Sequence, residues 1–227
     1  MLVTGFLPCR AGSKRVPQKS TRRFGFYEGG LLEKKLHQLK SVKLFDEIIV
    51  STNDCLVSEI ATQIMRGDSR FKLDDRPDEY CSDTATTDQL IEYLGSTFSF
   101  EHMLWTHVTC PFITTEDYEL IISKYFEVRK QQYDSLMTVR ELKTFLWNND
   151  GPINYDRRKL AWPMTQNLPV HYEIDSGVFL ADYEAYTKMS DRIGENVYLY
   201  PNSNLGSFDI DWLDDFELAE KLERIIS

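Results

Sequence analysis

The chain has 227 residues, 42% of them apolar, so it can bury one sizeable core, or one core with a small appendage. Its formal net charge of −10 argues against general nucleic-acid binding, because that binding mode depends on a broad basic face. No apolar run approaches the roughly 20 residues of a membrane span, and the stretch MLVTGFLPCR lacks the charged start and the length of a secretory signal, so we expect no membrane association and a cytoplasmic location.

A short buried strand is predicted over residues 2–8, and a long basic loop follows it. Between Cys9 and Phe24 the chain carries Lys, Arg, Pro and small hydroxyl residues, but almost no apolar residue at helical spacing. Loops of this length inside a compact domain are uncommon unless they bind a ligand. We call residues 9–24 the opening loop, and we expect it to be either a solvated basic segment or a binding site.

The opening loop has the parts of a triphosphate site. Gly12 and Ser13 can bring backbone N–H groups close to phosphate oxygens, and Arg10, Lys14 and Lys19 supply positive charge. Neither the P-loop pattern nor the glycine pattern of dinucleotide-binding proteins is present. A phosphate cradle of another kind is the functional interpretation of this loop.

Strands and amphipathic helices then alternate along the chain. The apolar patterns predict helices over 31–42, 55–66 and 115–130, a helix beginning near Thr84, and strands over 46–52, 70–74, 102–108 and 135–142. Such repetition implies an α/β fold with a Rossmann-like, mostly parallel sheet and helices on both faces. Ligands of such sheets bind beyond the carboxyl ends of the strands, which is where the opening loop lies.

The alternation stops at residues 141–173, where aromatic residues are mixed with several prolines. This segment is either a floppy insertion or an extended arm that packs against a partner subunit. Trp147 and Trp162 favour the arm, since exposed tryptophans in a disordered loop are rare. We therefore expect residues 1–227 to form a single domain with a dimerisation arm over 141–173, in a homodimer.

After the arm, the sequence predicts a strand and helix over 176–186, a strand over 196–201 and a helix over 213–226. Asp209 and Asp211 stand two residues apart on an extended segment, so both carboxylates point to the same side and can reach one hard cation. The alternative is a pair of surface acids ahead of a helix. Asp214 and Asp215 fit that alternative better, as charges at a helix N-terminus.

Six blocks of the sequence carry a resemblance. They are LPCRAGSKRVPQKS (7–20), VSTND (50–54), RPDEYCSDTATT (76–87), HVTCPF (107–112), YEIDSGVFL (172–180) and DIDWLDDFELAE (209–220). In this order they resemble the acylneuraminate cytidylyltransferase family over essentially the whole chain. The resemblance implies a cytidylyltransferase that transfers CMP from CTP to the anomeric hydroxyl of a nonulosonic-type sugar acid and releases pyrophosphate, with Mg²⁺ as cofactor.

The resemblance also implies roles for individual residues. The triphosphate would be held by Arg10, Ala11, Gly12, Ser13, Lys14, Lys19 and Ser20, and the ribose and base side would be lined by Arg76, Asp83 and Thr84. Asp209 and Asp211 would hold the metal, and the catalytic residues would be Arg10, Lys14, Lys19 and Asp211. Asp83 has a structural alternative, since it can cap the helix that follows it.

The acceptor side departs from the family pattern. Thr165 and Glu173 stand where members that use sialic acid carry arginine, and His107 replaces the usual Gln. A desolvated carboxylate needs a cation or a set of donors. Either an arginine of the arm meets it, or the substrate is not a standard sialic acid. The acceptor contacts predicted on this basis are His107, Thr109, Arg157, Arg158 and Gln166.

Two other function classes are consistent with an Asp-x-Asp motif beside a nucleotide-binding sheet. One is a metal-dependent glycosyltransferase that uses a nucleotide-diphosphate sugar, and the other is a binding protein without activity. A diphosphate-sugar enzyme has little need for Arg10, Lys14 and Lys19 around a leaving pyrophosphate. The presence of the whole set Arg10, Lys19, Asp209 and Asp211 disfavours the binding protein without activity. The identity of the general base stays open between a metal-bound hydroxide and a direct alkoxide.

Overall fold

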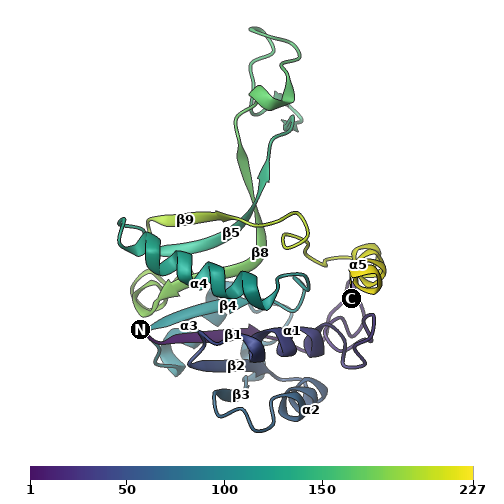
Figure 1. The fold of residues 1–227 in the computed structure, drawn as a ribbon, viewed down its shortest axis with the longest axis vertical. Coiled ribbons are helices and arrows are strands. Elements are labelled where there is room, and N and C mark those ends of the chain that lie inside the picture. The colour runs from purple at the N-terminus through teal and green to yellow at the C-terminus, as the bar shows by residue number, and fades with distance from the viewer. Residues whose placement is uncertain (227) are drawn as a thin grey trace.

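Seven strands form one sheet in the computed structural model, which describes residues 1–226 (Figure 1). They are β1 (Val3–Pro8), β2 (Glu47–Thr52), β3 (Phe71–Asp75), β4 (His102–Thr106), β5 (Ser135–Leu142), β8 (His171–Asp182) and β9 (Val197–Pro201). Their spatial order is β3-β2-β1-β4-β8-β5-β9. Strand β8 runs antiparallel to β4 and β5, whereas the other neighbours pair in parallel. The predicted mostly parallel sheet is therefore confirmed.

Helices cover both faces of this sheet, as predicted. They are α1 (Gly30–Ser41), α2 (Cys55–Ile64), α3 (Thr87–Thr97), α4 (Thr115–Arg129) and α5 (Leu213–Ile226). Successive strand residues point to opposite faces, so Leu7 joins the core cluster of α1, α2, α4 and α5, while Phe6 joins that of α3. Within residues 1–226, no helix combines the length and the apolar character that crossing a bilayer requires.

Helix α3 begins at Thr87 and not near Thr84, because the chain selects a later cap. The Thr86 hydroxyl accepts from the Gln89 backbone N–H at 3.2 Å, and the Gln89 side chain accepts from the Thr86 N–H at 2.9 Å. This reciprocal capping box satisfies two N–H groups that a helix start leaves unpaired. Asp83 therefore does not cap α3, and the structural alternative for this residue is wrong.

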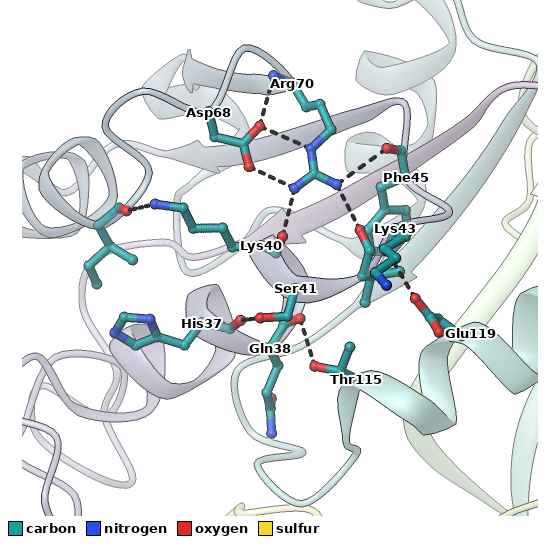
Figure 2. A network of polar contacts seen from close by, with 12 residues as sticks. His37, Gln38, Lys40, Ser41, Lys43, Phe45, Asp68, Arg70, Thr115 and Glu119 are labelled. Atoms are coloured by element: carbon teal, nitrogen blue, oxygen red, sulfur yellow. Dashed lines mark hydrogen bonds and ion pairs between the residues drawn. The ribbon is translucent and has the colours of Figure 1, made fainter.

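Arg70 ties the end of α1 to the start of β3 (Figure 2). Its guanidinium donates to the carbonyl oxygens of Lys40 at 2.6 Å and Val42 at 2.7 Å. The Asp68 carboxylate accepts from the same guanidinium at 2.9 and 2.7 Å. The last carbonyls of a helix lack intrahelical partners, so Arg70 closes α1 at the end remote from the opening loop.

A buried ion pair joins α5 to α1. Lys34 Nζ lies 2.7 Å from both carboxylate oxygens of Glu223, which is fully buried. On the same helix, the Phe216 ring packs edge-on against Phe24 at a centroid distance of 5.5 Å. The C-terminal helix, and the Asp-x-Asp segment before it, are thus fastened against the opening loop.

The segment between β5 and β8 projects from the sheet as an arm (Figure 1). Strands β5 and β8 stay paired as far as Leu142 opposite His171, and we call this paired extension the neck. Beyond it lie β6 (Trp147–Asn148), β7 (Gly151–Pro152) and one 3₁₀ turn, Thr165–Asn167. The predicted strand start at 176 is wrong, because pairing with β5 extends β8 back to His171. The helix predicted after it is a single π-helical turn, Ala185–Met189.

The arm carries its own small aromatic cluster. Phe145 packs edge-on against Tyr155 and Trp162 at centroid distances of 5.1 and 5.6 Å. The Arg157 guanidinium lies over the rings of Trp147 and Trp162 at 5.4 and 5.6 Å. The arm is therefore an ordered element, yet Trp147 and Trp162 remain 47% and 66% exposed.

Candidate active site

A cavity of about 490 Å³ lies where the opening loop leaves β1, at the carboxyl ends of β1 and β4. We call it the loop cavity. It is lined by Pro8, Cys9, Arg10, Ser13, Lys14, Arg15, Lys19, Ser20, Asp83, His107, Val108 and Thr109. This is the position that parallel α/β sheets use for ligands, and it is where the sequence predicted a binding loop.

The opening loop is held in a defined shape. Val16 and Phe24 are fully buried in the main core cluster and anchor its middle and its end. The Ala11 N–H donates to Asn53 Oδ1 at 3.0 Å. Gly12 has φ +82, a left-handed conformation that favours glycine. The loop is thus preformed, which a solvated basic segment would not need.

Two cations predicted to bind phosphate are paired with one carboxylate. Arg10 Nη1 lies 3.2 Å from one oxygen of Asp83, and Lys14 Nζ lies 2.6 Å from the other. Hydrogen bonds from Lys14 and Arg10 hold the pKa of Asp83 below its usual range. Exposed ion pairs of this kind are weak, so a phosphate can replace the carboxylate. Asp83 contacts Arg10 and Lys14 here, whereas the resemblance implied a place beside the ribose and base.

The opening loop also meets the Asp-x-Asp segment. Lys19 Nζ donates to the carbonyl oxygen of Ile210 at 2.8 Å, and burial lowers the pKa of Lys19 while Asp211 opposes that shift. Arg15 Nη2 lies 2.9 Å from Asp211 Oδ1, and the Arg15 guanidinium stacks over Trp212 at 5.3 Å. Basic loop and acidic segment therefore form one electrostatic unit.

The carboxylates of Asp209, Asp211 and Asp215 lie in different environments. Burial raises the pKa of Asp209, and a hydrogen bond from Thr109 acts in the opposite direction. Asp215 instead accepts from the backbone N–H groups of Asp211 at 3.1 Å and Trp212 at 2.7 Å. Asp215 thus caps the start of α5, as the helix-terminus alternative predicted for it. Asp209 and Asp211 instead contact Thr109 and Arg15, which line the loop cavity.

Asp209 and Asp211 line a second cavity, of about 400 Å³, at the base of the arm, and are not among the lining residues of the loop cavity. We call it the neck cavity. Its other lining residues are Arg140, Glu173, Ile174, Asp175, Ser176, Ser207, Trp212 and Asp215. Across the neck, Arg140 forms an ion pair with Glu173. The Asp pair therefore stands between a basic cavity and an acidic one.

A third cavity, of about 220 Å³, adjoins the loop cavity and shares Pro8, Arg10 and His107 with it. We call it the helix cavity, because the first turn of α3 lines it. Arg76 is buried in its wall and donates from Nη2 to the Ser51 carbonyl oxygen at 2.5 Å. Arg76 Nε is buried without a hydrogen-bond partner. An unpaired buried donor suits an acceptor atom of a ligand.

His107 is locked in the wall between two cavities. Its Nδ1 lies 2.8 Å from the Ser176 carbonyl oxygen, and its Nε2 accepts from Trp105 Nε1 at 2.9 Å. These partners fix the proton on Nδ1. Burial lowers the pKa of His107 to about 4. Both ring nitrogens are therefore occupied, and His107 is placed to position the wall and not to receive a substrate carboxylate.

A buried lysine supports the turn that carries Thr109. Lys35 Nζ donates to the Cys110 carbonyl oxygen at 2.8 Å and to Tyr118 Oη at 2.7 Å. The Tyr118 hydroxyl lies 2.8 Å from Thr106 Oγ1 at the end of β4. Burial lowers the pKa of Lys35 to about 7. No sequence motif pointed to this network, because its members come from α1, β4 and α4.

The structure brings most of the predicted site residues together. Those that line one of the three cavities are Arg10, Ser13, Lys14, Lys19, Ser20, Arg76, Asp83, His107, Thr109, Asp209 and Asp211. Ala11, Gly12, Thr84 and the arm residues Arg157, Arg158 and Gln166 are not among the lining residues. Arg15 and Arg140 were not predicted. The basic motif contained a signal for Arg15, but the sequence had none for Arg140.

Comparison with known proteins gives a consistent match. The cytidylyltransferase family model matches residues 4–225. Pseudaminic acid cytidylyltransferase of Campylobacter jejuni serotype O:2 is 24% identical over 229 residues, which cover 96% of this chain and 95% of that protein. Post-translational flagellin modification protein B of Campylobacter coli is 24% identical over 226 residues, which cover 94% of this chain and 91% of that protein.

Solved structures share the fold at lower identity. 4-Diphosphocytidyl-2C-methyl-D-erythritol synthase of Anaerococcus prevotii superposes with a TM-score of 0.66 at 14% identity, covering 98% of this chain and 96% of that one. CMP:2-keto-3-deoxy-manno-octonic acid synthetase, complexed with CTP, superposes with a TM-score of 0.64 at 13% identity, covering 98% of both chains.

Proposed function

Because this chain belongs to the cytidylyltransferase family, we propose that it transfers CMP from CTP to the anomeric hydroxyl of a nonulosonic-type sugar acid and releases pyrophosphate. The family match spans nearly the whole chain, so the predicted family and the predicted enzyme class, a CTP-dependent nucleotidyltransferase, are confirmed. The observation that carries the proposal is the position of Asp209 and Asp211 between the loop cavity and the neck cavity.

The loop cavity suits the triphosphate of CTP. In the reaction the acceptor oxygen bonds to the α-phosphorus, the bond from that phosphorus to the leaving pyrophosphate breaks, and the hydroxyl proton is released. Negative charge then builds on the pyrophosphate, and preorganised cations stabilise it. Arg10, Lys14 and Lys19 line this cavity. Arg10 and Lys14 would exchange Asp83 for phosphate oxygens.

The helix cavity suits the nucleoside. It opens beside Arg10, so a nucleotide can place its phosphates in one cavity and its base in the other. The free Nε–H of Arg76 would meet an acceptor atom of the ribose or the cytosine. Thr84 and Asp83 lie on the segment leading into α3, close enough in sequence to complete this wall.

Two aspartates fit a hard cation. Asp209 and Asp211 face the same cavity, and the charge of Asp211 helps to raise the pKa of Asp209. A cation with oxygen ligands would relieve that repulsion. No group of three or more His, Cys, Asp or Glu side chains in residues 1–226 is arranged to hold a metal, so Mg²⁺ would take its remaining ligands from water and phosphate. When bound, it would offset charge on the phosphates.

The arm fits a role in a homodimer. Exposed Trp147 and Trp162, with Arg157 stacked on both, are residue types enriched in interface cores. A two-fold dimer is the commonest closed assembly. In it, residues 141–173 of one subunit would reach the neck cavity of the other, where Arg158 and Gln166 would contact the acceptor. Residues 1–227 would then act as one cytoplasmic cytidylyltransferase domain with a dimerisation arm.

Pyrophosphate release tests the proposed function. Wild-type protein with CTP, Mg²⁺ and a panel of nonulosonic acids, pseudaminic and sialic acid among them, is expected to release pyrophosphate with at least one acid, and not when the acid is omitted. Replacing CTP by UTP or by a nucleotide-diphosphate sugar is the control. Sugar transfer from the latter without pyrophosphate release would favour the glycosyltransferase alternative instead.

A further inference from the structure

The neck cavity has an unusual charge distribution for a pocket that must accept an acid. Glu173, Asp175, Asp209, Asp211 and Asp215 all contribute carboxylates to its wall. Among the lining residues, Arg140 is the one cation. A negatively charged ligand would be repelled everywhere in this cavity except beside that guanidinium and beside a cation held by the Asp pair.

Most of these acids are already satisfied by the protein. Asp175 is buried and accepts from Thr138 Oγ1 at 2.6 Å and from the Gly177 N–H at 2.9 Å. Asp215 caps α5, and Asp211 pairs with Arg15. Glu173 differs, because its partner is Arg140 and the side chains of both are about half exposed, at 48% and 45%. An exposed pair of this kind opens at little cost.

Building on the proposed function, we propose that Arg140 is the specificity-determining residue that binds the acceptor's carboxylate, and that Glu173 occupies its place until the substrate arrives. The guanidinium fork matches a carboxylate in two parallel hydrogen bonds. An incoming carboxylate takes the place of the Glu173 carboxylate beside Arg140, and the half-exposed Glu173 side chain is released to solvent.

The other candidate cations are worse placed. Arg157 is stacked on two tryptophans of the arm, and Arg158 is 93% exposed and pairs with Asp156. His107 has no free ring nitrogen. Arg140 lies on β5, just beyond Val139, the last residue that pairs with β9, and it shares a cavity with Asp209 and Asp211. The acceptor's reacting hydroxyl and its carboxylate would then both lie within this one cavity.

The test is a comparison of the sugar acid with its carboxamide, in which the carboxylate charge is removed. For the wild type, kcat/KM should fall at least about tenfold on going to the carboxamide, as expected for loss of a charge-assisted hydrogen bond. Arg140→Gln should raise KM for the acid by a similar factor, leave KM for CTP unchanged, and no longer distinguish acid from amide. Arg140→Lys should recover part of the discrimination. Glu173→Gln should lower KM for the acid, and that effect should vanish in the double variant.

Arg224→Gln is the matched control, because Arg224 is also a half-exposed arginine in an ion pair but lies on α5, outside the three cavities. It should behave as wild type. Unchanged acid-to-amide discrimination in Arg140→Gln would overturn the proposal and return the carboxylate to the arm. A wild type that binds CTP by calorimetry but releases no pyrophosphate with any acid would overturn the proposed function. In that case, sugar acid binding by wild type and Arg140→Gln, measured by calorimetry, still decides the role of Arg140.

Discussion

The two sides of the Asp pair are built differently. On the loop side, Val16 and Phe24 are buried in the main core cluster, and Gly12 adopts a left-handed turn, so Arg10, Lys14 and Lys19 stand on a preformed frame. On the neck side, the wall is mostly acidic, its one arginine is paired across two strands, and the arm beyond it exposes two tryptophans.

This difference indicates a division of labour. A rigid frame positions charged groups before the reaction and so needs little reorganisation. The neck cavity instead carries an exposed ion pair, Arg140–Glu173, which can be substituted at little cost to the fold. The loop side would thus set the chemistry, and the neck side would set the sugar.

The largest effect on the difference between the two sides is expected from removing the charge of Asp209 or Asp211, which lie between them. Asp211→Asn and Asp209→Asn should each lower kcat about a hundredfold, or ~3 kcal/mol in the barrier, because transition-state charge stabilisation is lost. Asp214→Asn, in the first turn of α5, is the control and should retain activity. Wild-type rates in either site variant would remove that residue from the site.

If the arm of one subunit completes the partner's neck side through contacts other than the carboxylate, a chain altered in the arm should lose activity, and mixing it with a chain altered at Asp211 tests this. An Asp211→Asn chain and an Arg157→Ala/Arg158→Ala chain should together recover about a quarter of wild-type activity, since half of the randomly exchanged dimers are mixed and each has one whole site. Size-exclusion chromatography should show a dimer. No recovery after demonstrated exchange, or a monomer at micromolar concentration, would confine the site to one chain.

Substitutions on the loop side should change the kinetic constants for CTP. Arg10→Ala is expected to lower kcat and kcat/KM together by about tenfold or more, because its contact strengthens as charge builds on the phosphates. Asp83→Asn should instead lower KM for CTP, since it frees Arg10 and Lys14 from the ion pairs seen here. If Asp83→Asn raises KM for CTP, Asp83 contacts the nucleotide, as the family resemblance implied.

Features that depend on residues close in sequence could be predicted, and features that depend on distant residues could not. The strand over 135–142 and the helix over 213–226 agree with the structure to the residue, because apolar periodicity reports burial locally. The extension of β8 to His171 was missed because it depends on a partner strand. The start of α3 was predicted too early because several residues between Ser82 and Thr86 can cap a helix. The capping box with Gln89 places the cap at Thr86.

The site divides in the same way. Residues of the contiguous basic motif and the Asp-x-Asp pair could be found because one short segment carries several functional groups. The pairing of Arg140 with Glu173 could not, since these residues face each other only after β5 and β8 pair. The occupation of His107 by Trp105 and Ser176 was equally invisible, and it changes the role expected for His107 from substrate contact to wall.

The pH dependence of stability tests whether His107 is a neutral, buried residue of the wall. The pKa of His107 is about 4 when folded, below the ordinary value of 6.5, so between these values the unfolded chain binds the proton and the native chain does not. Stability should therefore rise with pH from about 4 to 6.5 and be lost as pH falls through that window. In His107→Gln, urea unfolding at several pH values should show a shallower slope. An unchanged slope would contradict a neutral, buried His107.

The smallest expected effect concerns the bend in β8 between the two sides. Ser176 has φ +57, a conformation that costs a residue with a Cβ roughly 1 kcal/mol and glycine almost nothing. Its carbonyl oxygen faces His107, and Asp175 before it is turned into the core, so the bend links the wall of the loop cavity to the neck cavity. Structural strain of this kind persists where the surroundings enforce it.

Ser176→Gly should therefore raise the free energy of unfolding by roughly 1 kcal/mol, measured by urea denaturation. Ser176→Ala keeps the Cβ and removes only the hydroxyl, so it should bring no gain. If glycine and alanine destabilise equally, the hydroxyl and not the backbone matters at this position. If glycine stabilises the fold while raising KM for the sugar acid alone, the hydroxyl belongs to the acceptor's surroundings. Ser176 would then contribute its hydroxyl to the neck cavity and its carbonyl oxygen to the wall of the loop cavity through His107.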